Sequence, residues 1–221
     1  MRKRSDDMRK MYRLSTKLRK DEVPIAASLA AKAFADSPCY VEIFPDRKGR
    51  EAFLAWMFER NFLLRLNDDC FRCTYDGDKL VSFFMFNKPG LTHPSFCDML
   101  RVGLLGGLVF YGLRVIYRLL VTKNWFEDKE RVVLGKRSGT MIRLERMTVL
   151  PGYQGKGIGT YALSSALEEA DEEGLSVILG TQEKRNVKFY KRLGFKVVDE
   201  CHVNIGKGYV NWTMVREPKA K

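Results

Sequence analysis

Apolar residues recur at helical spacing in two segments near the beginning of the chain. The first, IAASLAAKAFAD, follows Asp21, which stands where a helix N-cap is favoured, and Pro24, which suits a first helical turn. We predict a helix that starts there and is ended by Pro38. The second, REAFLAWMFERNFLLRL, repeats its apolar positions every three or four residues behind Pro45 and Asp46, which predicts another helix.

Shorter runs of apolar and β-branched residues predict strands. YRLS at 12–15 predicts a short strand, and the runs at 70–75 and 80–86 flank Asp76-Gly77-Asp78, a turn typical of a β-hairpin. Residues 95–121 have helical spacing, but they contain four glycines, each of which weakens a helix by about 1 kcal/mol against alanine. We predict a buried or pocket-lining pair of helices there.

Strand and helix patterns alternate from residue 141 onward. Strands are predicted at 141–150, 176–180, 195–199 and 209–216. Helices are predicted at 158–173, closed by Gly174, and at 187–193, capped by Asn186 and stopped by Gly194. This order predicts a mixed α/β fold, with a central sheet flanked by helices.

Composition and charge bound the class of protein. The chain has 221 residues, of which 45% are hydrophobic and 12% aromatic, so it is neither mostly disordered nor a small disulfide-dependent fold. Its formal net charge is +12, and residues 1–20 hold nine basic and two acidic side chains. We therefore predict a basic tail at 1–10 and one domain at 11–221. We expect neither nucleic acid nor a membrane as a partner, apart from a peripheral membrane contact.

Cysteine usage indicates the compartment and bears on metal binding. The chain has five cysteines and no apolar stretch at its start, which predicts free thiols and a cytoplasmic protein. The apolar run at 102–113 is shorter than the about 20 residues that a membrane span needs.

Cys70, Cys73, His93 and Cys97 are zinc-type ligands. Because Cys70 and Cys73 have an odd separation in a predicted strand, we expect their thiols on opposite faces, and we predict no metal.

A glycine-rich loop, Gln154-Gly155-Lys156-Gly157-Ile158-Gly159, lies between a predicted strand and a predicted helix. Without Cβ atoms its backbone N–H groups are open to a ligand, and with the first helical turn they form an anion site. The loop lacks the GxxxxGK[ST] pattern, and Thr160 replaces the third glycine of a dinucleotide fingerprint. We predict a pyrophosphate cradle, against the alternative of a glycine-rich turn without a ligand.

Two motifs in this region resemble those of the GNAT superfamily of N-acetyltransferases. VLPGYQGKGIG resembles the central motif, Val-x-Pro-x-x-Gln/Arg-x-x-Gly-x-Gly/Ala, and residues 186–195 resemble the family's downstream motif. The closing segments are similar to the branch that contains puromycin N-acetyltransferase. The resemblance is strong over 141–200 and poor over 88–135. It implies a mixed sheet of about six to seven strands, in which two parallel strands, 141–150 and 176–181, splay apart at an acetyl-CoA site.

The resemblance also implies how acetyl-CoA, the co-substrate, is bound. The backbone of Met147, Thr148 and Val149 is expected to hydrogen-bond the pantetheine arm as an added strand would. The loop N–H groups are expected to bind the pyrophosphate, with Gln154 shaping the loop; these belong to Gly155, Lys156, Gly157, Ile158 and Gly159. Asn186 either contacts the coenzyme or only caps its helix.

Two catalytic residues follow from the same resemblance. Tyr190 is the implied general acid for the departing thiolate, and the alternative is a core aromatic beside Phe189. Alternation along the strand groups Arg143, Glu145 and Met147 on one face. Related enzymes place a base two or four residues before the position of Met147, and arginine stays charged. Glu145 is therefore the candidate base, directly or through a water, and its alternative is an ion pair with a neighbouring Arg or Lys.

These features predict an acyltransferase that moves an acetyl group from acetyl-CoA to a primary amine by direct attack in a ternary complex. We expect an amine-bearing small molecule or a peptide as acceptor, a variable helical insert at 95–135 that shapes its pocket, and a monomer or homodimer. Gly180 and Glu183 depart from relatives that often carry Glu and Asn at these positions. Two rivals remain: a CoA-binding module without turnover, and a nucleic-acid or membrane-surface binder led by the basic tail.

Overall fold

The computed structural model describes residues 2–91, 96–103 and 106–219. Its strands are β1 (Arg13–Ser15), β2 (Phe71–Asp76), β3 (Lys79–Asn87), β4 (Ile142–Val149), β5 (Val177–Thr181), β6 (Lys196–Val203) and β7 (Tyr209–Arg216). Its α-helices are α1 (Arg2–Met11), α2 (Val23–Phe34), α3 (Pro38–Ile43), α4 (Arg47–Arg65), α5 (Phe96–Arg101), α6 (Gly106–Leu134), α7 (Ile158–Glu172) and α8 (Lys184–Arg192). Short 3-10 turns are η1 (Lys20–Glu22), η2 (Gly135–Thr140) and η3 (Pro151–Tyr153).

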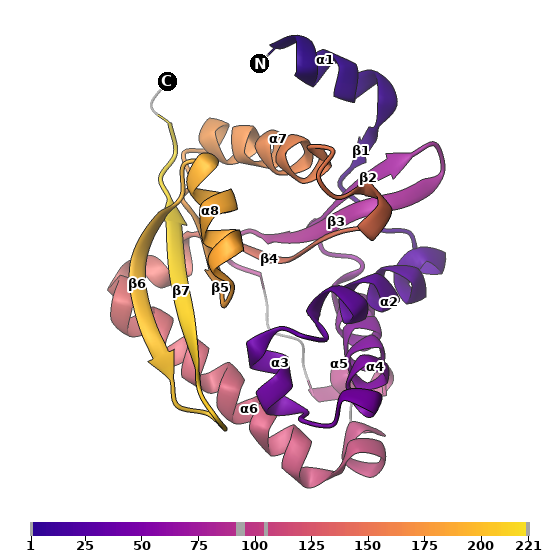
Figure 1. Ribbon diagram of the computed structural model, residues 1–221, viewed down its shortest axis with the longest axis vertical. Helices are drawn as coiled ribbons and strands as arrows, with labels where there is room; N and C mark the ends of the chain where they lie inside the picture. Colours follow the sequence, from indigo (N-terminus) through magenta and orange to yellow (C-terminus); the bar gives the residue numbers. More distant parts are fainter. Residues whose placement is uncertain (1, 92–95, 104–105, 220–221) are drawn as a thin grey trace.

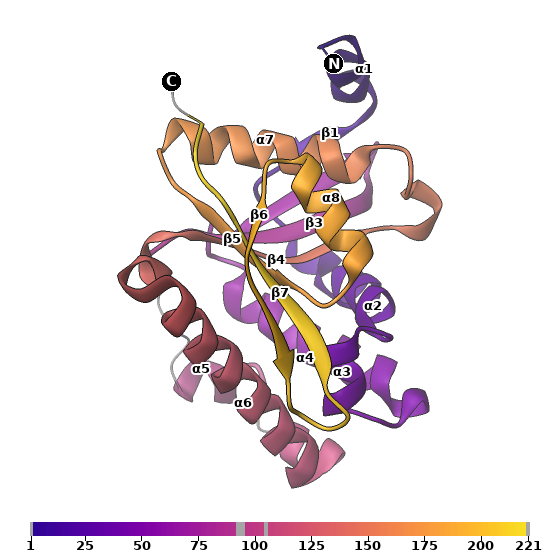
Figure 2. The same cartoon turned by 60° about the vertical axis from the view of Figure 1, so that its left-hand side comes forward.

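The described strands form one seven-stranded sheet in the order β1-β2-β3-β4-β5-β7-β6. The β4–β5 pair is parallel, and the other neighbouring pairs are antiparallel. Helices α7 and α8 lie on one side of the sheet, and α2, α3, α4 and α6 lie on the other (Figure 1, Figure 2). The predicted mixed α/β fold, with a sheet flanked by helices, is confirmed.

Strand β3 shows how the sheet separates two hydrophobic cores. Phe83 and Met85 are buried with residues of α2 and α4. Phe84 and Phe86 point the other way and are buried with residues of α7. Successive side chains of a strand alternate between faces, so an uninterrupted apolar run is the pattern of a strand that is covered on both sides.

Most predicted elements are present, including the β-hairpin of β2 and β3 and the helix behind Asp46. Both carboxylate oxygens of Asp46 accept backbone N–H groups of the first turn of α4, from Lys48 at 3.2 Å and from Gly49 at 3.0 Å. Such an N-cap stabilises a helix by about 1 kcal/mol. The helical pair predicted at 95–121 is found as α5 and α6, but it is not buried as a whole, because Leu113, Tyr117 and Leu120 are 75%, 67% and 52% exposed. The second helix continues to Leu134 and is interrupted at Gly112, whose φ is 78°.

Two predicted helix boundaries are wrong. Asp21 lies inside η1, and the N-cap residue of α2 is the neighbouring Glu22. The Glu22 carboxylate is buried and accepts a hydrogen bond of 2.7 Å from the Tyr75 hydroxyl. Helix α2 already ends at Phe34, and Pro38 begins α3. Proline suits a first helical turn because the N–H that it lacks has no partner there.

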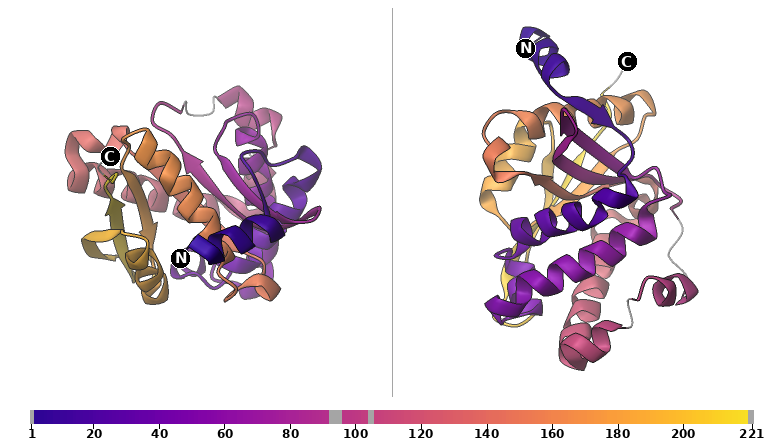
Figure 3. Two further views of the ribbon diagram at one scale, coloured as in Figure 1. Left: turned by 90° about the horizontal axis from the view of Figure 1, so that it is seen from above. Right: turned by 90° about the vertical axis from the view of Figure 1, so that its right-hand side faces the viewer.

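Residues of the predicted basic tail form α1. Met8 is buried against Val81 and Ile158, and this small cluster also includes Tyr12 and Tyr161. Figure 3 shows α1 lying against the beginning of α7. The division into a tail and a domain stays a prediction. Within the described residues, no helix combines the length and the apolar character needed to cross a bilayer.

Candidate active site

The parallel strands β4 and β5 separate soon after they meet. Their register contains only two pairs, Ile142 with Val177 and Arg143 with Ile178, in the described chain. Strand β4 continues to Val149, and its second half remains paired with β3 on the other side. Its edge toward β5 is therefore open, and an open strand edge is a template for an extended ligand.

A bulge at Arg146 changes the faces that β4 presents. Glu145 pairs with Met85 and Thr148 with Phe83, so β4 contains one more residue than β3 over this interval. Arg146 has a φ of 53°, which is uncommon for a residue other than glycine. The extra residue reverses the alternation beyond it.

The predicted grouping of Met147 with Arg143 and Glu145 on one face is therefore wrong. Met147 packs with Leu144 on the side of α7. The Arg146 guanidinium lies 5.6 Å from the centre of the Phe58 ring, which belongs to the core on the opposite side.

The glycine loop between β4 and α7 has the backbone of an anion cradle. Gly155 and Gly157 have φ values of 75° and 91°, a region that side chains disfavour. Gly157 is the N-cap residue of α7, and no side chain caps this end of the helix. The N–H groups of the first turn are therefore available to an anion, which the helix dipole also favours. This is the backbone geometry that a pyrophosphate cradle requires, and binding of a pyrophosphate there stays a prediction.

Neighbouring side chains fix the shape of this loop. The Gln154 side-chain amide donates a hydrogen bond of 3.0 Å to the carbonyl oxygen of Val149, which closes the turn. A Cβ on Gly159 would lie 3.2 Å from Met147 Cε and 3.4 Å from Val149 Cγ2. Glycine thus allows the first turn of α7 to approach β4 closely. Lys156 is exposed, and its ammonium lies 5.0 Å from the ring centre of Tyr153.

Thr148 takes part in one side-chain hydrogen bond to β3 and in one within β4. Its carbonyl oxygen accepts a hydrogen bond of 2.9 Å from the hydroxyl of Ser82 in β3. Its own buried hydroxyl donates at 3.1 Å to the carbonyl oxygen of Arg146. These bonds stabilise the bulged part of β4 next to the open edge.

Helix α8 carries the predicted general acid. The ring of Tyr190 packs edge-on against Phe189 and Phe195, with centroid distances of 5.1 and 5.6 Å. Burial raises the pKa of the Tyr190 phenol above its usual value. The aromatic packing beside Phe189 is the one that the core-aromatic alternative requires, and the role of Tyr190 as general acid stays a prediction.

Asn186 does not cap α8, contrary to the prediction. The helix begins earlier, at Lys184, and its N-cap residue is Glu183. The Asn186 side-chain amide instead donates a hydrogen bond of 3.2 Å to the Thr181 hydroxyl at the end of β5. It therefore ties α8 to the strand that borders the open edge, and a contact with the coenzyme stays a prediction.

Glu145 is part of a charged network on the face of β4 opposite α7. Its carboxylate lies 2.5 Å from Arg146 Nη1 and 3.9 Å from Arg143 Nε. Arg143 in turn forms a two-pronged ion pair with Glu130 of α6. The ion-pair alternative for Glu145 is thus present, while a role as base stays a prediction. Its side chain is 33% exposed, so a ligand or a water has access to it.

The structure adds Arg146 and Tyr40 to this face, which sequence patterns alone did not single out. Tyr40 packs edge-on against Phe58, the same ring that the Arg146 guanidinium approaches. Burial raises the pKa of Tyr40, and the charge of Arg146 opposes that rise. An arginine in an alternating strand carries no sequence signal for a bulge. The bulge is seen only in the register of β4 with β3, where β4 has one residue more than β3.

The cysteines considered as metal ligands are not gathered. Cys70 and Cys73 are buried in the same hydrophobic core, so the prediction that their thiols lie on opposite faces is wrong. Cys70 precedes the first residue of β2, and the alternation of the strand does not extend to it. Cys97 is exposed, and His93 lies outside the described residues. In the described part of the chain, no three His, Cys, Asp or Glu side chains are grouped as metal ligands.

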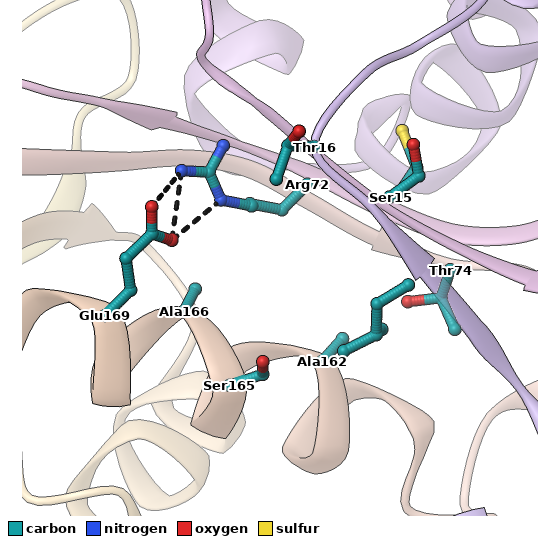
Figure 4. A pocket seen from close by; sticks show the side chains of 10 residues that line it. Ser15, Thr16, Arg72, Thr74, Ala162, Ser165, Ala166 and Glu169 are labelled. Carbon is teal, nitrogen blue, oxygen red and sulfur yellow. Dashed lines mark hydrogen bonds and ion pairs between the residues drawn. The ribbon is translucent and has the colours of Figure 1, made fainter. Parts of the chain in front are cut away.

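A cavity of about 390 Å³ lies elsewhere, between β1, β2 and α7 (Figure 4). Arg72 and Glu169 border it and form a two-pronged ion pair, with a shortest distance of 2.8 Å. None of the predicted site residues is among the described residues that line it. The cavity is therefore separate from the open edge and the glycine loop.

Comparison with known proteins gives the family. The sequence model of the acetyltransferase (GNAT) family matches residues 34–195. An uncharacterized N-acetyltransferase of Methanocaldococcus jannaschii is 30% identical over 76 residues, or 33% of this chain. The match spans only 30% of that relative's length.

Solved structures show the same fold. A structure described as histone acetyltransferase HPA2 and related acetyltransferase, from Corynebacterium glutamicum, is similar with a TM-score of 0.64 and 14% identity, over 96% of this chain and 98% of that one. A putative acetyltransferase of Salmonella typhimurium, solved with acetyl-CoA, has a TM-score of 0.55 and 13% identity, over 96% of both chains. The family match includes β4, the glycine loop, β5 and α8, and we conclude that the chain belongs to the acetyltransferase (GNAT) family.

Proposed function

We propose that this protein is an acyltransferase that moves an acetyl group from acetyl-CoA to a primary amine. The observation that carries the proposal is the open edge of β4 beside the uncapped, glycine-rich beginning of α7. An extended amide-containing arm joined to a pyrophosphate matches these two features in that order. The family membership and the acetyl-CoA bound to the Salmonella structure support the same ligand.

In this proposal the backbone of Met147, Thr148 and Val149 binds the pantetheine arm. The pyrophosphate is bound by the N–H groups of the loop from Gly155 to Gly159, and Gln154 holds that loop in shape. Gly155 and Gly157 fit this role because their positive φ values turn the loop without a side chain in the way. Lys156 adds a positive charge at the exposed side of the loop.

The chemistry is direct attack of the amine on the thioester within a ternary complex. Glu145 assists removal of the amine proton, directly or through a water, and Tyr190 donates a proton to the departing thiolate. The phenol of Tyr190 is protonated at neutral pH, as is any tyrosine of ordinary pKa, and so has a proton to give. Orientation of the two substrates by the protein accounts for part of the rate.

The acceptor approaches from the face of β4 that carries Glu145 and Arg146. Helix α6 borders this face through the ion pair of Glu130 with Arg143, which supports the role of the insert at 95–135 in shaping the acceptor pocket. An amine-bearing small molecule or peptide as acceptor, the puromycin N-acetyltransferase branch, a cytoplasmic location, and a monomeric or homodimeric state stay predictions.

The replacement Tyr190→Phe tests the proposal. Transfer is followed as free thiol released from acetyl-CoA in the presence of a panel of amines, aminonucleosides and peptides, and affinity is measured by calorimetry with CoA. We expect turnover to fall by about 100-fold or more, the usual contribution of a general acid, with little change in affinity. Tyr117→Phe is the matched control, because Tyr117 is 67% exposed on α6.

Equal turnover of the two variants would remove Tyr190 from the mechanism. Binding of CoA by the unaltered protein without transfer to any amine would favour the coenzyme-binding module instead. Absence of binding to CoA and acetyl-CoA would refute the proposed function altogether.

A further inference from the structure

Basic side chains without acidic partners surround the glycine loop. Arg9, Lys79 and Lys156 are exposed, and none of them forms an ion pair with a carboxylate within the described residues. Most other arginines of the described domain are paired, among them Arg72 and Arg216. Uncompensated positive charge beside an anion cradle indicates a ligand with more negative charge than the cradle itself neutralises.

Helix α1 brings Arg9 to this place. Met8 is buried against Ile158, the first residue of α7, and Tyr161 of the next turn completes the contact. Arg9 follows Met8 directly and remains exposed. Burial raises the pKa of Tyr161, and the charge of Arg9 opposes that rise, in agreement with the packing of the neighbouring Met8 against α7. Figure 3 shows the same approach of the two helices.

Lys79 and Lys156, the other two cations, lie near Tyr153, which belongs to the same hydrophobic cluster as Met8. Its ring centre lies 5.0 Å from the ammonium of Lys156 and 5.4 Å from that of Lys79. Its hydroxyl donates a hydrogen bond of 2.8 Å to Asp76, which fixes the ring. Tyr153, Tyr161 and Met8 pack in one hydrophobic cluster that includes Ile158, so the three cations lie at residues of, or next to, this cluster at the beginning of α7.

We propose that Arg9, together with Lys156, binds the 3′-phosphate of coenzyme A. The inference rests on the proposed function, in which the loop N–H groups neutralise the pyrophosphate. Coenzyme A carries a further phosphate monoester on its ribose, and this dianion is the part of the ligand that requires additional positive charge. The guanidinium of Arg9 matches phosphate because it presents several N–H donors in one plane. The basic N-terminal segment thereby has a role in coenzyme recognition.

The test compares CoA with 3′-dephospho-CoA, which differ only in this phosphate. We expect calorimetry at low salt to show about tenfold tighter binding of CoA, the effect of one or two exposed charge-assisted contacts. Arg9→Ala should reduce this preference to about threefold or less and leave binding of 3′-dephospho-CoA unchanged. Arg9→Lys should retain part of the preference. The preference should also shrink with added salt, because these charges are exposed.

Arg47→Ala is the matched control. It removes the same charge from an exposed position on α4, where Arg47 pairs with Asp36, and it should keep the full preference. Equal binding of CoA and 3′-dephospho-CoA by the unaltered protein would refute this inference while the proposed function stands. So would an equal loss for both ligands in Arg9→Ala. Binding of neither ligand by the unaltered protein would refute the proposed function and the inference with it.

Discussion

The ion pair that anchors the end of α7 to β7 offers a quantitative test of the structure. Asp171 accepts hydrogen bonds of 2.7 Å from both terminal nitrogens of Arg216, and a third of 2.9 Å from the backbone N–H of Lys219. The side chain of Arg216 is 4% exposed and that of Asp171 is 17% exposed. Asp171→Asn keeps the shape of the side chain, removes its charge, and leaves the guanidinium without a counterion.

The expected loss follows from this burial. Breaking a fully buried ion pair by removing one partner costs about 3–5 kcal/mol. Because water reaches Asp171 in part, we expect a loss of about 2–3 kcal/mol in the free energy of unfolding. For a domain of this size, that corresponds to a decrease of roughly 4–12 °C in Tm.

Urea unfolding across a pH series measures the effect, with Glu172→Gln as control. Glu172 is exposed on the same helix and has no ion pair in the described structure, so its loss should stay within about 0.5 kcal/mol. Hydrogen bonds from Arg216 hold the pKa of Asp171 below its usual value. The stabilisation is therefore complete above about pH 4, the ordinary pKa of an aspartate, and is lost as the pH falls through the lowered pKa. Equal stabilities of the two variants at pH 7, or a difference that does not shrink in acid, would refute this reasoning.

Two further predictions concern the loop and the candidate base. Gly157→Ala should lower the free energy of unfolding by about 1–2 kcal/mol and weaken CoA binding, because φ at this position is 91°; Gly152→Ala is the control, since φ there is ordinary and a Cβ meets nothing within 4 Å. Equal stabilities would show that the left-handed backbone at Gly157 is not required. Glu145→Gln should depress the rate of acetyl transfer mainly at low pH, where amine deprotonation limits it, by about 100-fold if Glu145 is the base. An unchanged pH–rate profile would show that Glu145 is not the base and that its role is the ion pair with Arg146.

Local sequence patterns were sufficient for most of the secondary structure and for the glycine loop. The N-cap at Asp46 and the hairpin turn have signals confined to a few neighbouring residues. The loop likewise depends on glycines that are close together in the chain, and two of them adopt the positive φ values that glycine alone tolerates well.

Features that depend on distant parts of the chain had no such signal. Glu169 and Asp171 belong to an acidic run on α7, and their partners Arg72 and Arg216 are 97 and 45 residues away. Asn186 is a good N-cap residue by type, but α8 begins at Lys184. The bulge at Arg146 has no signal in the sequence either. A period of two along a strand holds only while the register with the neighbouring strand is unbroken.

The single additional residue at Arg146 affects which side chains of β4 can vary independently of one another. It turns Met147 toward the first turn of α7 and leaves Glu145 and Arg146 on the opposite face of the sheet. One strand thus presents separate sets of side chains to the two faces of the sheet. Under the proposed function, we expect substitutions at 143 and 146 to change the choice of amine without weakening acetyl-CoA binding, which makes these two positions natural targets for directed evolution of specificity.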